Sequence, residues 1–230
     1  MATVPIIGGT GALGFGLALR LAAAGEHVVV GSRDIGRANE AVSRLREVLP
    51  QASAEAAVNE EAATRGDVVL LCVPFRAQSE NLTRLKPVLQ PGQVLVDATV
   101  PLAAAFSGKA TRLLGVPQGS AAEQAAEMVP DGVDVVSAFH TVSADRLRRL
   151  DEQLDEDVLI AGDRRAARRR VAELVLRIDG LRPVDCGPLE MARMIEGLTP
   201  LLISINRRYR THAGVRITGL PEDAAGHWAD

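Results

Sequence analysis

Three glycines near the start of the chain have a spacing that suits phosphate binding. Gly9, Gly11 and Gly14 form a G-x-G-x-x-G pattern between an apolar run and a helical pattern. The first glycine allows a tight bend out of the strand, the second lets a pyrophosphate approach the backbone, and the third lets the helix pack against the strand. A glycine-rich turn that binds nothing is the alternative, and the strand–turn–helix context favours a dinucleotide. The expected phosphate-binding residues are Gly9, Gly11, Ala12, Leu13 and Gly14.

A hydroxyl and two guanidinium groups follow the second apolar run. Ser32 and Arg33 stand at the tip of this predicted strand, and Arg37 lies one helical turn further along. In an NAD site, a carboxylate at about this distance binds the ribose 2′-hydroxyl and would repel a 2′-phosphate. Arginine instead suits a phosphate dianion, and Asp34 is better explained as the N-cap of the next helix. These residues favour NADP over NAD, although Arg37 alone is equally typical of a solvated helix.

Two further groups of residues lie at the carboxyl ends of predicted strands, where doubly wound sheets bind ligands. Val73, Pro74 and Phe75 end the strand predicted at 67–73, and Val100 follows the strand predicted at 94–97. We expect these residues to pack on the cofactor. A strand-ending proline followed by a core phenylalanine is an equally good explanation from the sequence.

His140 ends the strand predicted at 134–139 and is the candidate for chemistry. A single histidine is more often a hydrogen-bonded structural residue than a catalyst. The sequence offers no carboxylate pair, no Ser/His/Asp or Cys/His set and no cluster of metal ligands. Such a site suits hydride transfer, in which the cofactor carries the chemistry and the protein orients it.

The elements that must position these residues alternate between strands and helices. Apolar runs and helical patterns over residues 4–139 predict a doubly wound parallel sheet, with Ser120 and Glu123 as a capping box for a helix at 121–128. A smaller α/β unit follows, with strands at 158–161 and 182–185 and a helix at 164–178. We therefore predict an α/β fold with a dinucleotide-binding domain at 1–142 and a small C-terminal domain at 143–230.

The last predicted helix, at 189–207, is largely apolar and contains Pro200, where we expect a kink or break. So much apolar surface must be buried, so the helix either covers the ligand crevice or forms a dimer interface with a second copy of the chain. Residues 221–230 have the character of a tail, in which Trp228 has no evident role.

Composition excludes several classes of partner. The chain has 230 residues and a formal net charge of −3, so no global basic field favours nucleic acid. Its two cysteines form no disulfide framework. The start lacks the pattern of a signal peptide, and no apolar run is long enough to span a membrane. We expect a cytoplasmic protein.

Four segments together resemble one known family. They are Gly8–Gly14 (GGTGALG), residues 30–33 (VGSR), residues 136–141 (VSAFHT) and residues 179–189 (DGLRPVDCGPL). In this order the chain closely resembles the F420-dependent NADP oxidoreductases over nearly its whole length. The glycine motif is generic, whereas the Ser-Ala-Phe-His-Thr and Asp-Gly-Leu-Arg-Pro segments are much more specific.

The resemblance implies reversible hydride transfer between the nicotinamide C4 of NADP and C5 of the deazaflavin F420. It implies a homodimer with a Rossmann-like N-terminal domain. It also implies that Thr10, Ser32, Arg33 and Arg37 bind the 2′-phosphate, that Ala138 lies against the nicotinamide and that His140 lies near the deazaflavin. Pro74-Phe75 departs from the Pro-Trp typical of the family but keeps an aromatic residue.

Two other functions use the same scaffold. One is an NADPH-dependent reductase of an imine, a ketone or a flavin, and the other is a non-catalytic NADP sensor. A β-hydroxyacid dehydrogenase fits poorly, because the chain is short and neither Lys86 nor Lys109 is a clear catalytic lysine. Fold alone does not separate these functions.

Overall fold

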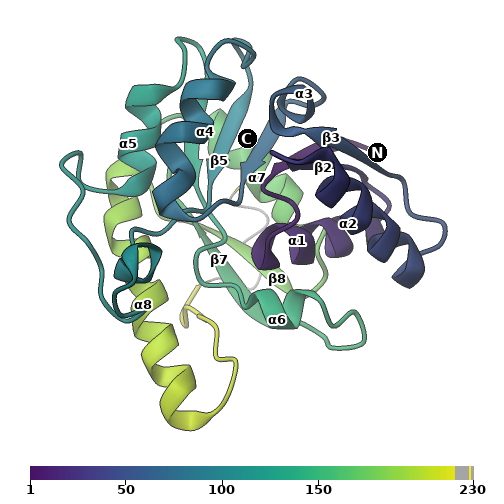
Figure 1. Cartoon of the computed structure of the whole chain (residues 1–230). Helices are drawn as coiled ribbons and strands as arrows, with labels where there is room; N and C mark the ends of the chain where they lie inside the picture. Colours follow the sequence, from purple (N-terminus) through teal and green to yellow (C-terminus); the bar gives the residue numbers. More distant parts are fainter. Residues whose placement is uncertain (221–227, 229–230) are drawn as a thin grey trace.

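The computed structural model describes residues 1–220 and Trp228. Its centre is a six-stranded sheet, with every neighbouring pair parallel, in the order β3-β2-β1-β4-β5-β6 (Figure 1). The chain reverses its direction of travel across the sheet between β1 and β4, which confirms the predicted doubly wound fold. The strands are β1 (Thr3–Ile7), β2 (His27–Ser32), β3 (Ala54–Val58), β4 (Val68–Leu71), β5 (Val94–Asp97) and β6 (Asp134–Ser137).

Helices cover both faces of this sheet and divide its core in two. Leu17, Leu45 and Val171 belong to the cluster on one face, whereas Leu82 and Ala122 belong to the other. The strands read as apolar runs because side chains on both of their faces are buried. The helices on the first face are α1 (Ala12–Ala23), α2 (Ile35–Val48) and α7 (Arg165–Val175), and those on the second are α3 (Asn59–Ala63), α4 (Gln78–Leu85) and α5 (Ala121–Met128).

A two-stranded parallel sheet, β7 (Glu156–Ile160) and β8 (Leu181–Asp185), extends the structure beyond β6. An antiparallel bridge between Ser137 and Ala161 links it to the main sheet. Core residues from both parts share one hydrophobic cluster. The predicted domain division at residue 142 stays a prediction.

Arg20 fastens the short helix α6 (Ala144–Leu147) to α1. Its guanidinium donates hydrogen bonds to the backbone carbonyls of Arg146, Leu147, Arg149 and Glu152. The side chain is almost completely buried, so these acceptors replace the water it would otherwise bind. Sequence patterns do not predict this contact, because its partners are more than 120 residues away.

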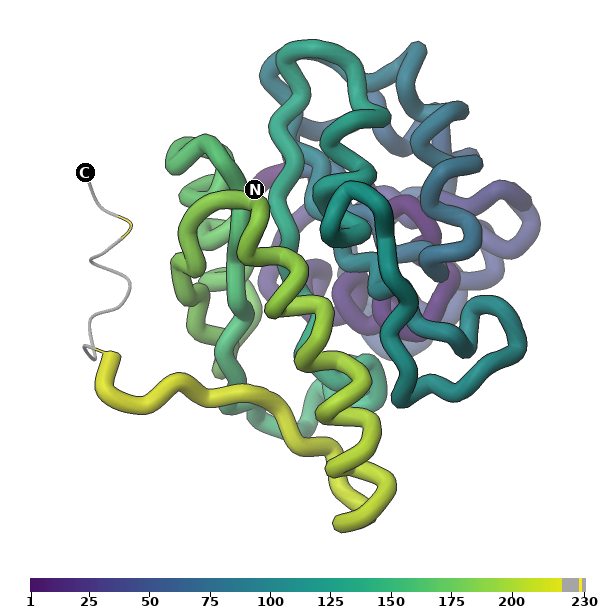
Figure 2. Tube along the Cα trace, turned by 90° about the vertical axis from the view of Figure 1, so that its left-hand side faces the viewer, coloured from purple at the N-terminus to yellow at the C-terminus, as the bar shows by residue number. Residues whose placement is uncertain are grey.

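Helix α8 (Ala192–Tyr209) follows a 3₁₀ turn, η3 (Leu189–Met191), and runs through Pro200 without a break. Its last turns project beyond the body of the protein (Figures 1 and 2). The chain then returns to β7, where the buried carboxylate of Asp157 accepts two hydrogen bonds at 2.8 Å from Arg182. Among the described residues, no helix is long and apolar enough to cross a membrane.

Most predicted elements are present, with shifted ends. The strands predicted at 67–73 and 134–139 end at Leu71 and Ser137, and the helix predicted at 76–89 is a 3₁₀ turn, η1 (Phe75–Ala77), followed by α4. The predicted tail lies outside the described residues except for Trp228. Trp228 is buried, and its indole N–H donates to the carbonyl of Pro183 at 3.4 Å, so it has a packing role that the sequence did not indicate.

Candidate functional site

A groove of about 440 Å³ opens at the carboxyl edge of the sheet, where the strand order reverses. It lies between the turn after β1 and the end of β2 on one side and the segment after β4 on the other. It brings together half of the predicted cofactor-binding residues, from three segments that are far apart in sequence. Those that line it are Thr10, Gly11, Ser32, Arg33, Arg37, Val73 and Pro74.

The tight bend after β1 includes both Gly8 and Gly9. Gly8 has a φ of +74°, a conformation that favours glycine, whereas Gly9 is not among the residues with positive φ. Position 9 requires glycine because of close packing, since a Cβ there would lie 2.9 Å from the carbonyl oxygen of Ile6 and 3.0 Å from the Val30 side chain. The turn therefore depends on two adjacent glycines, Gly8 for its positive φ and Gly9 for its close contact with Ile6.

The other two glycines of the pattern have different surroundings. A Cβ on Gly14 would lie 2.7 Å from the carbonyl oxygen of Gly8 and 2.9 Å from the Cα of Gly9, so only glycine allows this helix to approach the turn. A Cβ on Gly11 would meet Gly8 at 3.3 Å and Cys72 at 3.8 Å. Gly11 is exposed toward the groove, which leaves room for a phosphate above its backbone.

The N-terminus of α1 is not capped by a side chain of the described residues, with Gly11 at the N-cap position. Two other helices differ, since Asp34 caps α2 and Ser120 caps α5, as the sequence predicts. A helix N-terminus carries unpaired N–H groups and a partial positive charge, which together bind anions. The structure thus leaves these donors of α1 available beside the groove, and a pyrophosphate fits their chemistry.

Arg33 and Arg37 bring positive charge to the β2 end of the groove. Asp34, which lies between them, accepts hydrogen bonds from the backbone N–H groups of Gly36 and Arg37 at 2.8 and 3.3 Å. Ser32 is buried, and its hydroxyl accepts from the N–H of Asp34 at 3.2 Å. Capping thus engages the Asp34 carboxylate with backbone N–H groups rather than with either guanidinium group.

Two charged residues of the groove were missed by the sequence reasoning. Glu80 and Arg84 lie one turn apart on α4 and line the wall opposite β2. The Glu80 carboxylate lies 3.7 Å from the Arg33 guanidinium and 3.1 Å from that of Arg84. Helical spacing marks this pair as a surface i,i+4 ion pair, and nothing in the sequence indicates that it faces Arg33.

Two buried asparagines fix the glycine turn to the neighbouring helices. The Asn59 side-chain oxygen accepts from the N–H of Gly8 at 3.4 Å, and its amide donates to the Asn81 oxygen at 2.9 Å. The Asn81 amide in turn donates to the carbonyl of Ala77 at 2.7 Å. One sequence feature could have indicated that Asn81 is buried. It falls on the same face of α4 as Gln78 and Leu82, which are also buried.

The predicted packing residues divide into those on the groove and those beside it. Val73 and Pro74 line the groove. Phe75 starts η1 and is half-buried, and Val100 is half-buried after the end of β5. Neither Phe75 nor Val100 is among the residues that line the groove.

Ala138 and His140 follow β6 in a buried turn. Phe139 between them has a φ of +68°, which is rare for a bulky residue, and its ring is fixed in the core. Ala138 is fully buried and His140 nearly so, and neither lines the groove. Burial lowers the pKa of His140 to about 4, although the nearby Thr99 backbone opposes the shift, and neither ring nitrogen has a well-formed hydrogen bond among the described residues. A neutral imidazole with unused polar atoms is the feature here that suits a polar ligand.

A polar network supports the loop that follows β5. The Asp97 carboxylate is fully buried and accepts hydrogen bonds from the Gln78 amide at 2.6 Å and from the N–H of Thr99 at 2.7 Å. The Gln78 amide also donates to the Thr99 hydroxyl and to the carbonyl of Ala121. Burial raises the pKa of Asp97 to about 6, while these hydrogen bonds oppose the shift.

Helix α8 is attached to this region by two polar side chains. The buried Glu196 carboxylate accepts hydrogen bonds from the N–H groups of Ala121 and Ala122, at the start of α5, at 3.0 and 3.1 Å. The Thr199 hydroxyl donates to the carbonyl of His140 at 2.9 Å. The position of α8 is thereby tied to the turn that carries His140.

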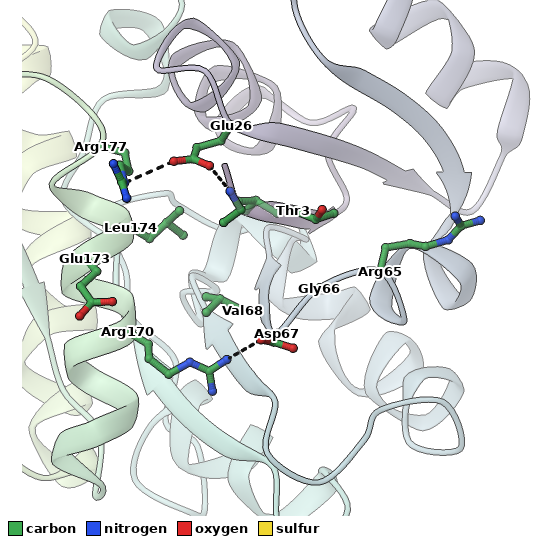
Figure 3. A pocket seen from close by; sticks show the side chains of 12 residues that line it. Thr3, Glu26, Arg65, Gly66, Asp67, Val68, Arg170, Glu173, Leu174 and Arg177 are labelled. Carbon is green, nitrogen blue, oxygen red and sulfur yellow. Dashed lines mark hydrogen bonds and ion pairs between the residues drawn. The ribbon is translucent and has the colours of Figure 1, made fainter.

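A second hollow lies near the amino ends of β1 and β4, at the other edge of the sheet (Figure 3). Its charged groups are already paired, since Arg177 lies 3.3 Å from Glu26 and Arg170 lies 3.6 Å from Asp67. None of the predicted site residues lines it. Doubly wound sheets bind ligands at the opposite edge, so the groove above β1 and β4 is the candidate site.

Known proteins resemble this chain over nearly its whole length. A family model described as NADP oxidoreductase coenzyme F420-dependent matches residues 3–101, which include the glycine turn and the arginines. The F420-dependent NADP reductase of Methanothermobacter thermautotrophicus is 46% identical over 223 residues, covering 95% of this chain and 96% of that protein. The F420-dependent NADP reductase of Methanocaldococcus jannaschii is 42% identical over 222 residues, covering 94% and 98%.

A solved structure shares the fold. The crystal structure of a proposed F420-dependent NADP-reductase from Arthrobacter sp. FB24 has a TM-score of 0.73 and 24% sequence identity, and covers 92% of this chain and 96% of that one. At this sequence identity the solved structure shows only that the fold is shared. The relatives at 42–46% identity show the family.

Proposed function

This chain belongs to the family of F420-dependent NADP oxidoreductases, and we propose that it transfers a hydride reversibly between NADP(H) and the deazaflavin F420. The observation that carries the proposal is the groove itself. An uncapped helix N-terminus and an accessible Gly11 lie at one end of it, and Arg33 and Arg37 lie at the other. This arrangement suits a dinucleotide that carries a 2′-phosphate.

Each wall of the groove would bind a different part of NADP. The first N–H groups of α1 would donate to the pyrophosphate above Gly11. Arg33 and Arg37, with the Thr10 and Ser32 hydroxyls nearby, would bind the 2′-phosphate, for which arginine offers charge-assisted hydrogen bonds. Val73 and Pro74 would pack on the adenosine half. Gly9 and Gly14 would hold the turn in shape rather than touch the cofactor.

The two rings would meet beyond the ends of β5 and β6. When both are bound, NADPH supplies a hydride from nicotinamide C4 and F420 accepts it at C5. His140, neutral at pH 7, would orient the deazaflavin through its unused ring nitrogens. Ala138 is fully buried, so its contact with a nicotinamide requires a local opening of the wall that covers it. The protein would thus act by orienting the rings and excluding water.

We also propose that two copies of the chain associate through α8. Met194 and Leu201 on this helix are 66% and 54% exposed, which leaves apolar surface uncovered. A homodimer, which the family resemblance implies, would cover it. Light scattering of the purified protein measures the mass directly, and a monomer at micromolar concentration would contradict the proposal. A cytoplasmic location stays a prediction from the sequence.

An absorbance assay tests the proposed reaction. Purified protein is mixed with oxidised F420 and either NADPH or NADH, and absorbance is followed near 420 nm. We expect the deazaflavin band to disappear in proportion to the NADPH supplied, and much faster than with NADH. If NADPH binds in calorimetry but the band persists, the chain is a sensor or reduces another acceptor, and imines, ketones and flavins would be tested next.

A further inference from the structure

Glu80 brings negative charge to the part of the groove where a 2′-phosphate would bind. It lies in the first turn of α4, a position that favours carboxylates because of the helix dipole. Its oxygen lies 3.7 Å from the Arg33 guanidinium, beyond hydrogen-bonding distance but close enough for an ion pair. Both side chains are about half exposed, at 49% for Glu80 and 60% for Arg33, so either can turn toward a ligand.

The charges that line the groove show why this contact matters. Three arginines, Arg33, Arg37 and Arg84, face two carboxylates, Asp34 and Glu80. Asp34 is engaged as the N-cap of α2, whereas Glu80 accepts no hydrogen bond from a backbone N–H among the described residues. Glu80 is therefore the carboxylate that a ligand phosphate would meet as a competitor.

We propose that Glu80 is a specificity-determining residue that competes with the 2′-phosphate of the cofactor for Arg33. This inference rests on the proposed function, because it requires a ligand with that phosphate. When the phosphate approaches, the Arg33 guanidinium turns from Glu80 to the ligand, and Arg84, at 3.1 Å, remains as the partner of Glu80. Binding therefore breaks one weak ion pair and leaves the carboxylate near a dianion.

The competition lowers the affinity for NADPH without a comparable effect on NADH, which has a hydroxyl at the same position. Exposed ion pairs are weak and repulsion in solvent is screened, so the effect is modest. We expect Glu80→Gln to bind NADPH about 3- to 10-fold more tightly at low ionic strength, with the gain shrinking as salt is added. The affinity for NADH should change by less than about 2-fold.

Isothermal titration calorimetry with NADPH and NADH, at low and high salt, tests the inference. Glu60→Gln is the matched control, because Glu60 also pairs with Arg84, at 3.9 Å, but does not line the groove. Its NADPH affinity should equal that of the unaltered protein. In an Arg33→Ala background, Glu80→Gln should raise NADPH affinity little, because the guanidinium for which Glu80 and the phosphate compete is absent.

Three results would overturn the inference. NADPH affinity that is unchanged or weaker in Glu80→Gln would mean that Glu80 positions Arg33 rather than competing for it. If Glu80→Gln raised the affinities for NADPH and NADH equally, or raised NADPH affinity just as much in the Arg33→Ala background, Glu80 would act only through general electrostatic repulsion and not by competing for Arg33. If the unaltered protein binds no NADPH, the proposed function fails as well, whereas the first three results leave NADPH binding intact.

Discussion

The Asn59 side-chain amide donates a hydrogen bond to the Asn81 side-chain oxygen at 2.9 Å, and both residues are buried beneath the glycine turn. Since the Asn59 oxygen also accepts from the N–H of Gly8, this pair connects α3 and α4 to the bend that shapes the groove. We expect Asn59→Ala to lower the free energy of unfolding by about 1–3 kcal/mol, because it leaves buried polar groups unpaired.

The same substitution should weaken NADPH binding, because the turn loses a support. Chemical unfolding and calorimetry measure the two effects. Asn39→Ala, on the exposed face of α2, is the control for stability and should change it by less than about 0.5 kcal/mol. An Asn59→Ala protein as stable as the unaltered one would show that this hydrogen-bond chain contributes little.

Arg33 should distinguish the two nicotinamide cofactors. Loss of one charge-assisted contact costs about 1.5–3 kcal/mol, so Arg33→Ala should weaken NADPH binding roughly 10- to 100-fold and NADH binding much less. Arg207→Ala removes the same charge from an exposed position late in α8 and should leave both affinities unchanged. Equal losses for NADPH and NADH in Arg33→Ala would refute the assignment of the 2′-phosphate.

Gly11 and Gly14 form a matched pair, because a methyl group at each meets different surroundings. Gly14→Ala would press on backbone atoms of Gly8 and Gly9 and should destabilise the fold by about 1–3 kcal/mol. Gly11→Ala should change stability by less than about 1 kcal/mol, yet weaken NADPH binding at least about 10-fold, because the methyl group occupies the space of the pyrophosphate. Thermal unfolding and calorimetry give both quantities. Undiminished affinity in a folded Gly11→Ala protein would contradict the proposed phosphate site.

Glu196 should make stability depend on pH. Burial raises its pKa to about 8, although the N–H donors of Ala121 and Ala122 oppose the shift. The folded protein keeps this proton up to about pH 8, whereas the unfolded chain loses it near pH 4.5. Unfolding between these values therefore releases a proton, and the stability that Glu196 contributes falls as pH rises.

Glu196→Gln cannot ionise and lacks this dependence. From pH 5 to pH 8, the unfolding free energy of the unaltered protein should fall by about 1–3 kcal/mol relative to the variant. Glu190→Gln, an exposed change shortly before α8, should keep the original pH profile. Parallel profiles for the unaltered protein and Glu196→Gln would show that the carboxylate ionises normally.

Sequence reasoning predicted the parts of the fold that local patterns determine. The apolar runs, the glycine turn, the caps at Asp34 and Ser120 and the cluster around Arg33 are all encoded within a few residues. The contacts it missed join distant segments: Arg20 with the α6 carbonyls, Asn59 with Asn81, and Glu80 with Arg33. No local pattern carries such contacts, because they depend on how the helices pack across the sheet.

Smaller differences from the sequence-based expectations also have physical causes. In the glycine turn it is Gly8 that takes positive φ, and two consecutive glycines do not reveal this from the sequence. Helix α8 continues through Pro200, whose lost hydrogen bond is tolerated where packing and Glu196 hold the helix in place. Ala138 is fully buried by the surrounding core, so its expected contact with a ring stays a prediction.

The most direct test of hydride transfer is to follow the hydrogen itself. NADPH carrying deuterium at one or the other C4 position is mixed with oxidised F420 and the protein, and the reduced F420 is analysed by mass spectrometry. A fixed geometry of two stacked rings should transfer one deuterium from one labelled form and none from the other. Reduced F420 without deuterium from either form, or no reduced F420, would contradict direct transfer between the two cofactors.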